Sequence, residues 1–371
     1  MAGSAPISLL HVFPSFAAGG QQTRFATLAG AMGSGFHHYV AALDGDYAAA
    51  AALKPASDIS FCELAGRKSR LFSPTAIKAA RKLIEKINPD ILCTYNWGAI
   101  EAAFANWRGQ HIAHIHFEDG FGPDETPDRQ KIGRVLARRM ILKNSVVVVP
   151  SQTLESIALS CWGLGRDRVR CIANGIDVAR FSKGRCGNRN DGVVVGTVCA
   201  LRPEKNVPRL VRAFAMADRE ALAQLAIVGE GPARQSIETT AKQCGAGARV
   251  KLVGATAAPE TAYHGFDIFA LTSDTEQAPL SLMEAMAAGL PVAAFDVGDI
   301  ADMVAAENRP FIVPAGDEWA FANVLRRLIA GGQIRTWLGN ANAARAQATF
   351  GLESMVEAHK ALYLEAAGRS S

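Results

Sequence analysis

Two glutamates, Glu276 and Glu284, have a type and spacing suited to holding a sugar or a nucleotide. The apolar run 267–271 before them predicts a short buried strand, and Pro279 and Gly289 predict the start and the end of a helix. Glu276 would then lie in the loop and Glu284 within the helix, so both could face a cleft at the carboxyl edge of a parallel sheet. Carboxylates there can accept hydrogen bonds from sugar hydroxyls, and the helix N-terminus can hold a phosphate.

The frame from Pro279 to Pro291 reads Pro-x-x-x-x-Glu-Ala-Met-Ala-Ala-Gly-x-Pro. With Glu276 it resembles the glutamate–seven-residue–glutamate motif of retaining glycosyltransferases of family 4, which have the two-domain GT-B fold. The resemblance implies that Glu276 contacts the donor sugar and Glu284 the ribose of the nucleotide. An amphipathic helix with one solvated glutamate is the alternative, and the surrounding frame favours the family.

The same resemblance assigns the segment between the glutamates to donor binding. The residues concerned are Gln277, Ala278, Pro279 and Leu280. Gln277 and Ala278 stand where the family most often has Gly and Phe. If the loop needs a positive φ at position 277, glutamine would be strained there.

Arg202 and Lys205 follow a second apolar run, 193–200, and precede a predicted helix. Two cations in such a place can neutralise a leaving diphosphate, and solvated surface charge is the alternative. The resemblance implies the diphosphate role, although the spacing is one residue shorter than in some members. In the same half, Gly229 and Gly231 form a strand-to-helix turn that in the family lines the nucleotide pocket.

In the first half, Gly19 and Gly20 separate a predicted strand from a predicted helix. Glycines allow a positive φ and a close approach of the backbone to a ligand, and an ordinary tight turn would serve equally well. The resemblance implies contact with the donor diphosphate and the acceptor. The segment lacks the G-x-G-x-x-G pattern, which disfavours a nicotinamide-dependent dehydrogenase.

A histidine-rich strand is predicted over 111–117, with His114 and His116 on one face. The resemblance implies that His116, at the carboxyl end of this strand, lies close to the donor sugar, whereas His114 is expected to be structural. The following Glu118 and Asp119 are candidate acceptor-side carboxylates. No third ligand completes a metal site around the two histidines.

Apolar runs alternate with helical patterns along the chain, which predicts an α/β fold of two doubly wound Rossmann-like domains facing across a cleft. Strands are expected near 7–13, 36–43, 58–63, 90–94, 111–117, 145–149, 193–200, 222–228, 249–253, 267–271 and 291–295. Helices are expected near 20–32, 74–87, 98–107, 129–143 and 151–161, and in most of the chain beyond 317.

The predicted domains are an N-terminal acceptor-binding domain over 1–184, a linker over 185–192, a C-terminal nucleotide-sugar-binding domain over 193–345, and a final helix over 346–371 that could pack back on the first domain. The motif Asn174-Gly175-Ile176-Asp177-x-x-x-Phe181 matches the hinge of the family.

The charge is unevenly distributed: residues 1–190 hold 23 Lys and Arg against 15 Asp and Glu, and the remaining residues hold 16 against 20. The segment 129–143 has six cations and no acid, and at helical spacing Lys131, Arg134 and Arg138 form one stripe. A helix resting on an anionic membrane and a solvated helix covering the sheet are equally compatible with this pattern. The sequence shows no nucleic-acid motif, no apolar run of spanning length, and an odd number of cysteines, seven.

The resemblance implies metal-independent transfer, with retention of configuration, of a hexose-type sugar from a UDP-sugar or GDP-sugar. No cofactor is expected beyond this substrate. The acceptor would be a sugar or a lipid-linked hydroxyl used for cell-envelope polysaccharide or glycolipid, on the cytoplasmic side and in peripheral contact with the membrane. A non-hydrolysing nucleotide-sugar epimerase and an inactive sugar-nucleotide binding protein are the alternatives.

Overall fold

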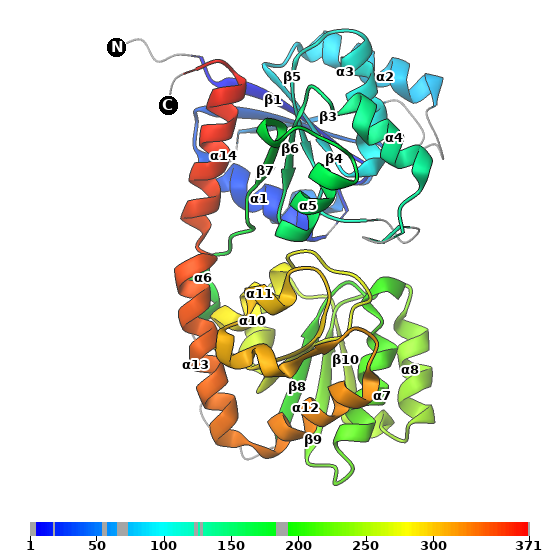
Figure 1. Cartoon of the computed structure of the whole chain (residues 1–371), viewed down its shortest axis with the longest axis vertical. Coiled ribbons are helices and arrows are strands. Elements are labelled where there is room, and N and C mark those ends of the chain that lie inside the picture. Colours follow the sequence, from blue (N-terminus) through cyan, green and yellow to red (C-terminus); the bar gives the residue numbers. More distant parts are fainter. Residues whose placement is uncertain are drawn as a thin grey trace. The chain divides into compact units, whose positions relative to one another are not determined.

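The computed structural model describes residues 5–17, 19–53, 58–64, 73–121, 125–126, 129–182 and 192–369. The chain divides into two compact units, coloured along the sequence in Figure 1. The first contains residues 1–174 and 353–371, and the second contains residues 175–352. Each unit is built on its own parallel sheet, so each is described by itself.

The first unit has a seven-stranded parallel sheet in the order β3-β2-β1-β4-β5-β6-β7. Its strands are β1 Ile7–Phe13, β2 Phe36–Ala42, β3 Ile59–Cys62, β4 Ile91–Tyr95, β5 Ala113–Phe117, β6 Val146–Val149 and β7 Val169–Cys171. Its helices are α1 Gly20–Met32, α2 Pro74–Ile87, α3 Ile100–Arg108, α4 Ile132–Ile141, α5 Gln152–Ser160 and α14 Leu352–Ala366. Because β1 and β4 are neighbours, the strand order reverses between them.

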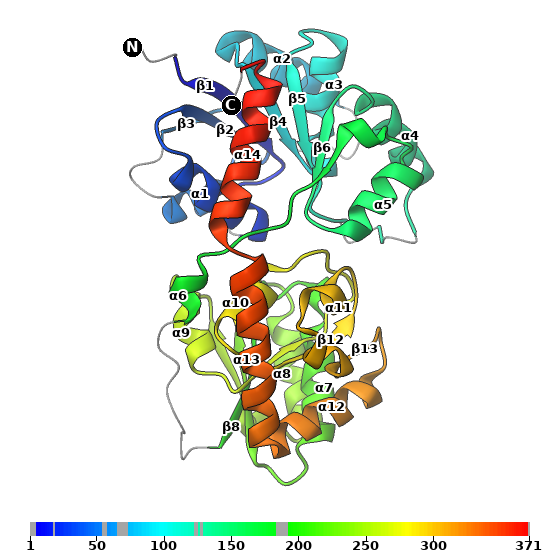
Figure 2. The same cartoon turned by 60° about the vertical axis from the view of Figure 1, so that its left-hand side comes forward.

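Both faces of this first sheet are covered. On one face, Leu10 and Leu92 pack with residues of α2 and α3 such as Leu83 and Ala102. On the other face, aromatic rings of successive strands stack, with Tyr95 3.9 Å from Phe13 and 4.9 Å from Phe117 between ring centroids. The ring of His359, on α14, stacks on Phe117, so the last helix of the chain completes this layer (Figure 2).

The second unit has a six-stranded parallel sheet in the order β10-β9-β8-β11-β12-β13. Its strands are β8 Val193–Val198, β9 Ala223–Val228, β10 Val250–Gly254, β11 Ile268–Leu271, β12 Val292–Asp296 and β13 Ile312–Pro314. Its helices are α6 Val178–Ser182, α7 Val207–Ala217, α8 Arg234–Gln243, α9 Pro259–His264, α10 Leu280–Ala287, α11 Ile300–Met303, α12 Glu318–Ala330 and α13 Gly332–Thr349. The strand order reverses between β8 and β11, which are neighbours.

Alternation along the central strand separates two apolar cores in this unit. Ile268 and Ala270 face a core formed with α7, α8 and α12, whereas Phe269 and Leu271 face a core formed with α9 and α10. A strand buried on both faces reads as a continuous apolar run, which explains the sequence of β11.

The first division between the units falls after Asn174, ten residues before the expected domain end at 184. The reason is packing: Ile176, Val178 and Phe181 belong to a core of the second unit, and the Ile176 N–H donates to the Phe350 carbonyl at 2.9 Å. The expected linker lies almost entirely outside the described residues. The expected last helix, 346–371, is two helices: α13 ends in the second unit, and nearly all of α14 belongs to the first.

Candidate functional site

The loops that follow β8 and β11 carry most of the expected donor residues. Both loops leave the carboxyl ends of neighbouring parallel strands at the point where the strand order of the second sheet reverses. Open α/β sheets bind their ligands at such points. The site can therefore be built from these two loops and from α10, which follows the second of them.

Lys205 and Glu276 meet across these loops, with Lys205 Nζ 2.6 Å from Glu276 Oε1. Ser273 Oγ donates to the same oxygen at 2.7 Å. Glu276 is 9% exposed, so the pair is largely shielded from solvent without being sealed. Both donors use Oε1, and Oε2 of Glu276 lies outside these two bonds.

Further hydrogen bonds fix the two loops to each other. The Asp274 N–H donates to the Glu204 carbonyl at 2.8 Å, and Thr272 Oγ1 donates to the Asn206 carbonyl at 3.2 Å. Arg209, on α7, pairs with the Asp274 carboxylate at 2.6 Å. The backbone carrying Lys205 is thus tied to the backbone carrying Glu276.

Gln277 is buried, and its φ is not positive. Five non-glycine residues of the described chain have a positive φ, and Gln277 is not one of them. The expected strain at position 277 therefore does not arise. The positive φ lies instead at Gly298, after β12, with a value of 60°. A Cβ atom at Gly298 would lie 2.3 Å from the Glu276 carbonyl oxygen, and the next residue, Asp299, donates its N–H to the Gln277 carbonyl at 3.1 Å.

Helix α10 begins after Pro279, which is its N-cap residue, and the chain leaves it through Gly289 with a φ of 71°. Ala278 is buried, and Leu280 is the first helical residue. The first N–H groups of any α-helix have no acceptor within the helix, so this end offers donors for an anion. Glu284 lies one turn further along.

Glu284 accepts a hydrogen bond at Oε2 from the Tyr263 hydroxyl, at 2.6 Å. Burial raises the pKa of the Glu284 carboxyl above its usual value, and the hydrogen bond from Tyr263 opposes that rise. Tyr263 is fully buried on α9, and burial, with the nearby Glu284 charge, raises its pKa well above 10. One oxygen of Glu284 is therefore held by a neutral phenol.

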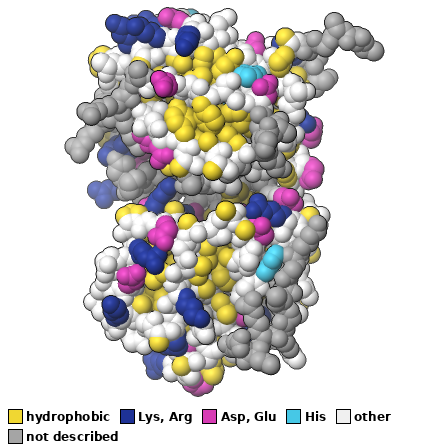
Figure 3. All heavy atoms as spheres, turned by 180° about the vertical axis from the view of Figure 1, so that it is seen from behind, with side chains coloured by type: hydrophobic (Ala, Val, Ile, Leu, Met, Phe, Trp, Pro, Cys, Tyr) yellow, Lys and Arg dark blue, Asp and Glu magenta, His cyan; other side chains and the backbone are white. Residues whose placement is uncertain are grey.

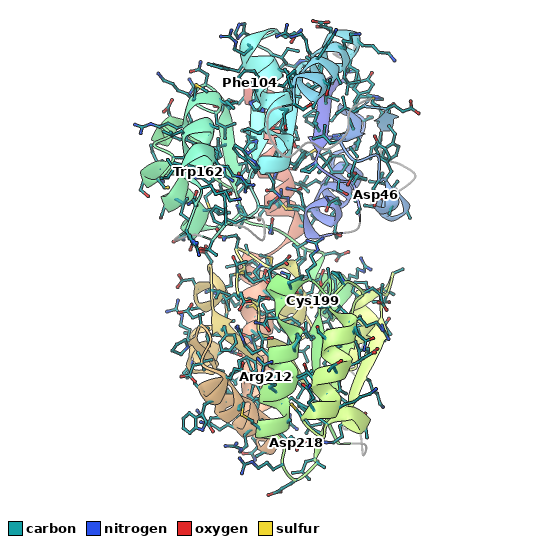
Figure 4. All side chains as sticks on the ribbon, turned by 90° about the vertical axis from the view of Figure 1, so that its right-hand side faces the viewer. Asp46, Phe104, Trp162, Cys199, Arg212 and Asp218 are labelled. Atoms are coloured by element: carbon teal, nitrogen blue, oxygen red, sulfur yellow. The ribbon has the colours of Figure 1, made fainter. Side chains whose placement is uncertain are left out.

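Arg202 is about half exposed and pairs with Glu204 at 4.0 Å. Cys199 directly follows β8, the strand from which this loop departs. Figure 4 labels Cys199 at that end of the sheet and Asp218, the C-cap of α7, at the opposite end. Burial raises the pKa of the Cys199 thiol to about 11 although Lys205 opposes the rise, so Cys199 is a neutral thiol rather than a nucleophile.

Gly229 and Gly231 have φ values of 142° and 155°. A Cβ atom at Gly229 would lie 1.8 Å from the Cys199 carbonyl oxygen, and one at Gly231 would lie 2.5 Å from the Leu201 carbonyl oxygen. These glycines therefore let the loop after β9 pack against the loop that leads to Arg202.

In the first unit, the Gly19–Gly20 loop lies at the corresponding reversal of strand order. Gly19 is the extended N-cap of α1, with a φ of −175°, and Gly20 is the first helical residue. Gly19 therefore does not have the positive φ that its residue type would allow. Gln21 and Arg24, from the first turns of α1, both bond the carboxylate of Asp119, which follows β5. The loop and this candidate acceptor-side carboxylate are thus brought together.

His114 and His116 share one face of β5, as predicted, and both bond Thr94 Oγ1 at 2.8 Å. His116 is 0% exposed, and its other ring nitrogen lies 3.5 Å from Glu118 Oε2. Burial lowers the pKa of His114 to about 3, so this imidazole is neutral. In this structure His116 therefore faces the protein interior.

Glu118 is fully buried and pairs with Arg138 of α4 at 3.2 Å. Burial alone would raise the pKa of Glu118, but Arg138 and His116 outweigh it, and the pKa lies below its usual value. Arg138 also contacts Glu125 at 3.5 Å and lies 4.8 Å from the centroid of the Trp162 ring. This candidate acceptor-side carboxylate is thus occupied by an internal ion pair.

The prediction that Lys131, Arg134 and Arg138 form a membrane-facing stripe at the surface is wrong. Arg138 is 1% exposed, and Arg134 pairs with buried Glu125 at 3.0 Å. Buried carboxylates attract these two arginines inward, because an unpaired buried charge is costly. Only Lys131 of the three is exposed, and its backbone N–H bonds Glu125 at 2.9 Å.

Sequence reasoning missed three residues that hold the expected ones: Ser273 on Glu276, Tyr263 on Glu284 and Arg24 on Asp119. Ser273 lies three residues before Glu276, so its position could have suggested the contact. Tyr263 and Arg24 come from distant segments and carried no local signal.

Within the described residues, no group of three or more His, Cys, Asp and Glu side chains could hold a metal ion. Over the same part of the chain, every helix is too short or too polar to cross a bilayer.

Two doubly wound α/β units, with a Lys–Glu pair and a helix N-terminus at the switch point of the second sheet, have the architecture of the GT-B class. Two family models match the chain: Glycosyltransferase Family 4 over residues 18–180 and Glycosyl transferases group 1 over residues 180–345. The chain belongs to the glycosyltransferases that these two models describe.

Relatives with assigned activities match parts of the chain. D-inositol 3-phosphate glycosyltransferase of Xylanimonas cellulosilytica is 27% identical over 308 residues, which are 76% of this chain and 73% of that protein. GDP-mannose-dependent alpha-mannosyltransferase of Mycolicibacterium smegmatis is 36% identical over 174 residues, 46% of this chain and 42% of that protein. The second match thus spans less than half of the relative's length.

Solved structures share the fold over nearly the whole chain. Sucrose-phosphate synthase from Thermosynechococcus elongatus has a TM-score of 0.79 at 22% identity, covering 96% of this chain and 98% of that chain. Anabaena HepE, in complex with UDP and glucose, has a TM-score of 0.80 at 17% identity, covering 96% and 99%. At such identities the likeness shows the GT-B fold.

Proposed function

We propose that this protein is a retaining glycosyltransferase that moves a hexose-type sugar from a nucleoside-diphosphate donor to a hydroxyl acceptor. The observation that carries the proposal is the shielded Lys205–Glu276 pair at 2.6 Å, at the switch point of the second sheet. Glu276 lies on the loop that leads directly into α10 and Glu284. The chain belongs to the glycosyltransferases, and this membership supports glycosyl transfer as the reaction.

In this proposal the second unit binds the donor. Glu284 accepts hydrogen bonds from the ribose hydroxyls through the oxygen that Tyr263 does not occupy. The N-terminus of α10, from Ala278 to Leu280, faces the diphosphate, and Gln277 and the Gly229–Gly231 turn border the nucleotide. One relative is GDP-mannose-dependent and one structural neighbour binds UDP, so UDP-sugars and GDP-sugars are the donors to test.

The chemistry breaks the bond between the anomeric carbon and the diphosphate oxygen, and the electron pair leaves with the diphosphate. Arg202, Lys205 and the helix N-terminus stabilise this negative charge, which lets transfer proceed without a metal ion. Glu276 positions the sugar through hydroxyl contacts while the anomeric carbon is oxocarbenium-like. The acceptor oxygen attacks the same face, and its proton passes to the leaving phosphate.

The acceptor is assigned to the first unit, whose sequence carries the positive charge excess. Asp119 and the Gly19–Gly20 loop lie together there, and Glu118 is held by Arg138. His116 is proposed to position Glu118 rather than to contact the sugar, because it is fully buried. We assign the acceptor to lipid-linked or cell-envelope saccharides at the cytoplasmic side of the membrane.

Calorimetric titration with UDP, GDP and ADP tests the donor site, with Glu284→Ala as the variant. Selective binding of one nucleotide is expected, and the variant should bind it about 10–100-fold more weakly, since hydrogen bonds to a charged group contribute ~1.5–3 kcal/mol. Glu238→Ala, on the surface of α8, serves as the matched control and should bind normally.

Failure of all three nucleotides to bind would contradict the donor site and, with it, the proposed transferase. If binding is confirmed, incubation with the matching nucleotide sugar and candidate acceptors distinguishes the remaining classes. A transferase releases nucleoside diphosphate together with a glycosylated product. A non-hydrolysing epimerase releases no free diphosphate and returns an epimerised nucleotide sugar.

A further inference from the structure

Helix α4 (Ile132–Ile141) has two of its three arginines turned inward and three large apolar residues turned outward. Arg134 and Arg138 point to the interior, where they pair with Glu125 and Glu118. Ile132, Leu136 and Met140 are 79%, 58% and 51% exposed. A helix that covers a sheet normally has the opposite arrangement.

The three exposed residues form one continuous stripe. They are spaced by four, and a turn of α-helix holds about 3.6 residues, so successive members are displaced by only ~40° around the axis. Arg139 lies on the same side at this spacing and is exposed, and Lys143 is exposed in the turn that follows the helix. The outer face of α4 is therefore an apolar stripe accompanied by cations, with no acid between Arg129 and Lys143.

Exposed apolar atoms alone do not indicate a docking surface. Figure 3 shows apolar side chains at the surface of both units, with charged ones around them, and exposed apolar atoms are ordinary for a folded protein. The other strongly exposed large apolar residues of the described chain are Phe61, Leu222, Val253, Trp319 and Trp337. Four of them lie alone on their own elements and Leu222 lies in the loop before β9, whereas α4 has three in line.

We propose that α4 is a lipid-docking helix that lies in the headgroup region of an anionic bilayer. Ile132, Leu136 and Met140 enter the boundary of the acyl chains, and Arg139 and Lys143 bind headgroup phosphates. Interfacial helices combine an apolar face with Lys and Arg in this way. Anionic lipid supplies about 1 kcal/mol for each Lys or Arg near the surface, and a neutral surface lacks this attraction.

Charge and size disfavour a second copy of this chain as the occupant. Two α4 faces packed in parallel would place Arg139 and Lys143 of one copy against the same cations of the other. The helix has ten residues and is about 15 Å long, so its exposed stripe is far smaller than the ~800 Å² per partner of a stable interface. A bilayer needs no such area from one helix.

Vesicle sedimentation tests the proposal, with phosphatidylcholine vesicles compared with vesicles that also contain phosphatidylglycerol. The wild-type chain should pellet with the anionic vesicles and much less with the neutral ones. The triple variant I132Q/L136Q/M140Q should lose at least ~10-fold in binding to anionic vesicles, because polar amides do not enter the acyl boundary. Arg139→Gln/Lys143→Gln should bind more weakly and respond less to added salt.

The matched control is Trp319→Gln, which removes an isolated aromatic residue that is 73% exposed on α12. It should pellet like the wild type. Equal pelleting on neutral and anionic vesicles, or full binding by the triple variant, would overturn the proposal. A wild-type dimer in analytical ultracentrifugation that the triple variant loses, without vesicle binding, would assign the stripe to self-association instead.

The proposal rests on the proposed function only in expecting a lipid-linked acceptor, because vesicle binding needs neither donor nor turnover. Titration of the triple variant with the nucleotide that the wild type binds keeps the two separate. Normal nucleotide binding with no vesicle binding by either protein would reject the lipid-docking helix and leave the transferase standing. Vesicle binding without nucleotide binding would reject the transferase and support the lipid-docking helix.

Discussion

Ser273 and Lys205 both donate to Oε1 of Glu276, and this shared acceptor determines how that carboxylate can act. Lys205 places a positive charge 2.6 Å from this carboxylate before any ligand arrives. The rotamer is held by a neighbouring serine and by a lysine on another loop. Preorganisation of this kind lets a positioning group meet a sugar without first reorganising itself.

Gly298 supports the same loop from the far side, and its substitution should damage the site. In Gly298→Ala the new Cβ would lie 2.3 Å from the Glu276 carbonyl oxygen, so the loop must shift. We expect nucleotide-sugar affinity or turnover to fall about tenfold or more, as displacements of ~1 Å can reduce rates by ~100-fold. Titration and initial rates with the matching donor measure this change.

Gly316→Ala is the matched control for backbone strain. Gly316 also has a positive φ, 83°, but a Cβ there would meet nothing within 4 Å. Both variants should lose about 1–2 kcal/mol of stability from the left-handed backbone. Equal donor binding by the two variants would show that the contact with Glu276 has no functional weight.

The sequence motif predicted Glu276, Glu284, Lys205 and Gly229 as parts of one region, and the structure places them on neighbouring loops or on the helix that follows. The partners of these residues were not predictable to the same degree. Tyr263 reaches Glu284 from α9 because of tertiary packing, and no local pattern records that contact. Arg138 was expected at the surface since a buried arginine and a solvated one look alike in a helical repeat.

At the scale of elements, periodicity predicted most strands and helices to within two residues. The bounds expected for β1, α1 and α2 agree with those observed. The short edge strands β7 and β13 were missed because three residues are too few to show an alternating pattern. In β5, His111 has a positive φ of 55°, so the strand starts two residues later than expected.

Two fully buried asparagines join α13 to the sheet of the second unit. Asn342 donates to the Leu290 carbonyl at 2.9 Å and accepts from the Ala305 N–H at 3.1 Å. It also donates to Asn308, which bonds both backbone groups of Val292. These bonds fix the helix against the strand β12 that precedes Gly298.

Asn342→Leu should therefore destabilise the protein by roughly 3 kcal/mol, because two buried backbone groups lose their partners at ~1–3 kcal/mol each. Urea denaturation of the second unit measures the change. Asn340→Leu, two residues away on the exposed side of the same helix, is the control and should change stability little. A similar loss in both variants would mean that the buried amide network contributes nothing specific.

At the scale of the whole molecule, buried histidines are concentrated in one unit. Burial lowers the pKa of His38 and His359 to about 4 and that of His114 to about 3, and it lowers the pKa of His11 well below 6.5. All four belong to the first unit. The second unit has a single histidine, His264, which is partly exposed.

Acid should therefore destabilise the first unit before the second. Between pH 6.5 and about 4 the unfolded chain binds protons at these histidines and the folded unit does not, so stability falls as the pH falls. Each group contributes up to ~1.4 kcal/mol per pH unit within that window. Hydrogen exchange followed by mass spectrometry at pH 7 and pH 5, corrected for intrinsic rates, resolves the two units. Parallel loss of protection in both would contradict the expectation.

The chain passes from the first unit into the second and then returns, so the second unit is an insertion within the first. The returning helix, α14, supplies His359 and Tyr363 to the first unit, and Arg369 Nη1 donates to the Ala5 carbonyl at 2.6 Å. During synthesis, residues 175–352 emerge as one uninterrupted segment, whereas the first unit lacks its covering helix until α14 has been made. The first unit is therefore completed on the ribosome after the second, the reverse of the usual N-terminal-first order.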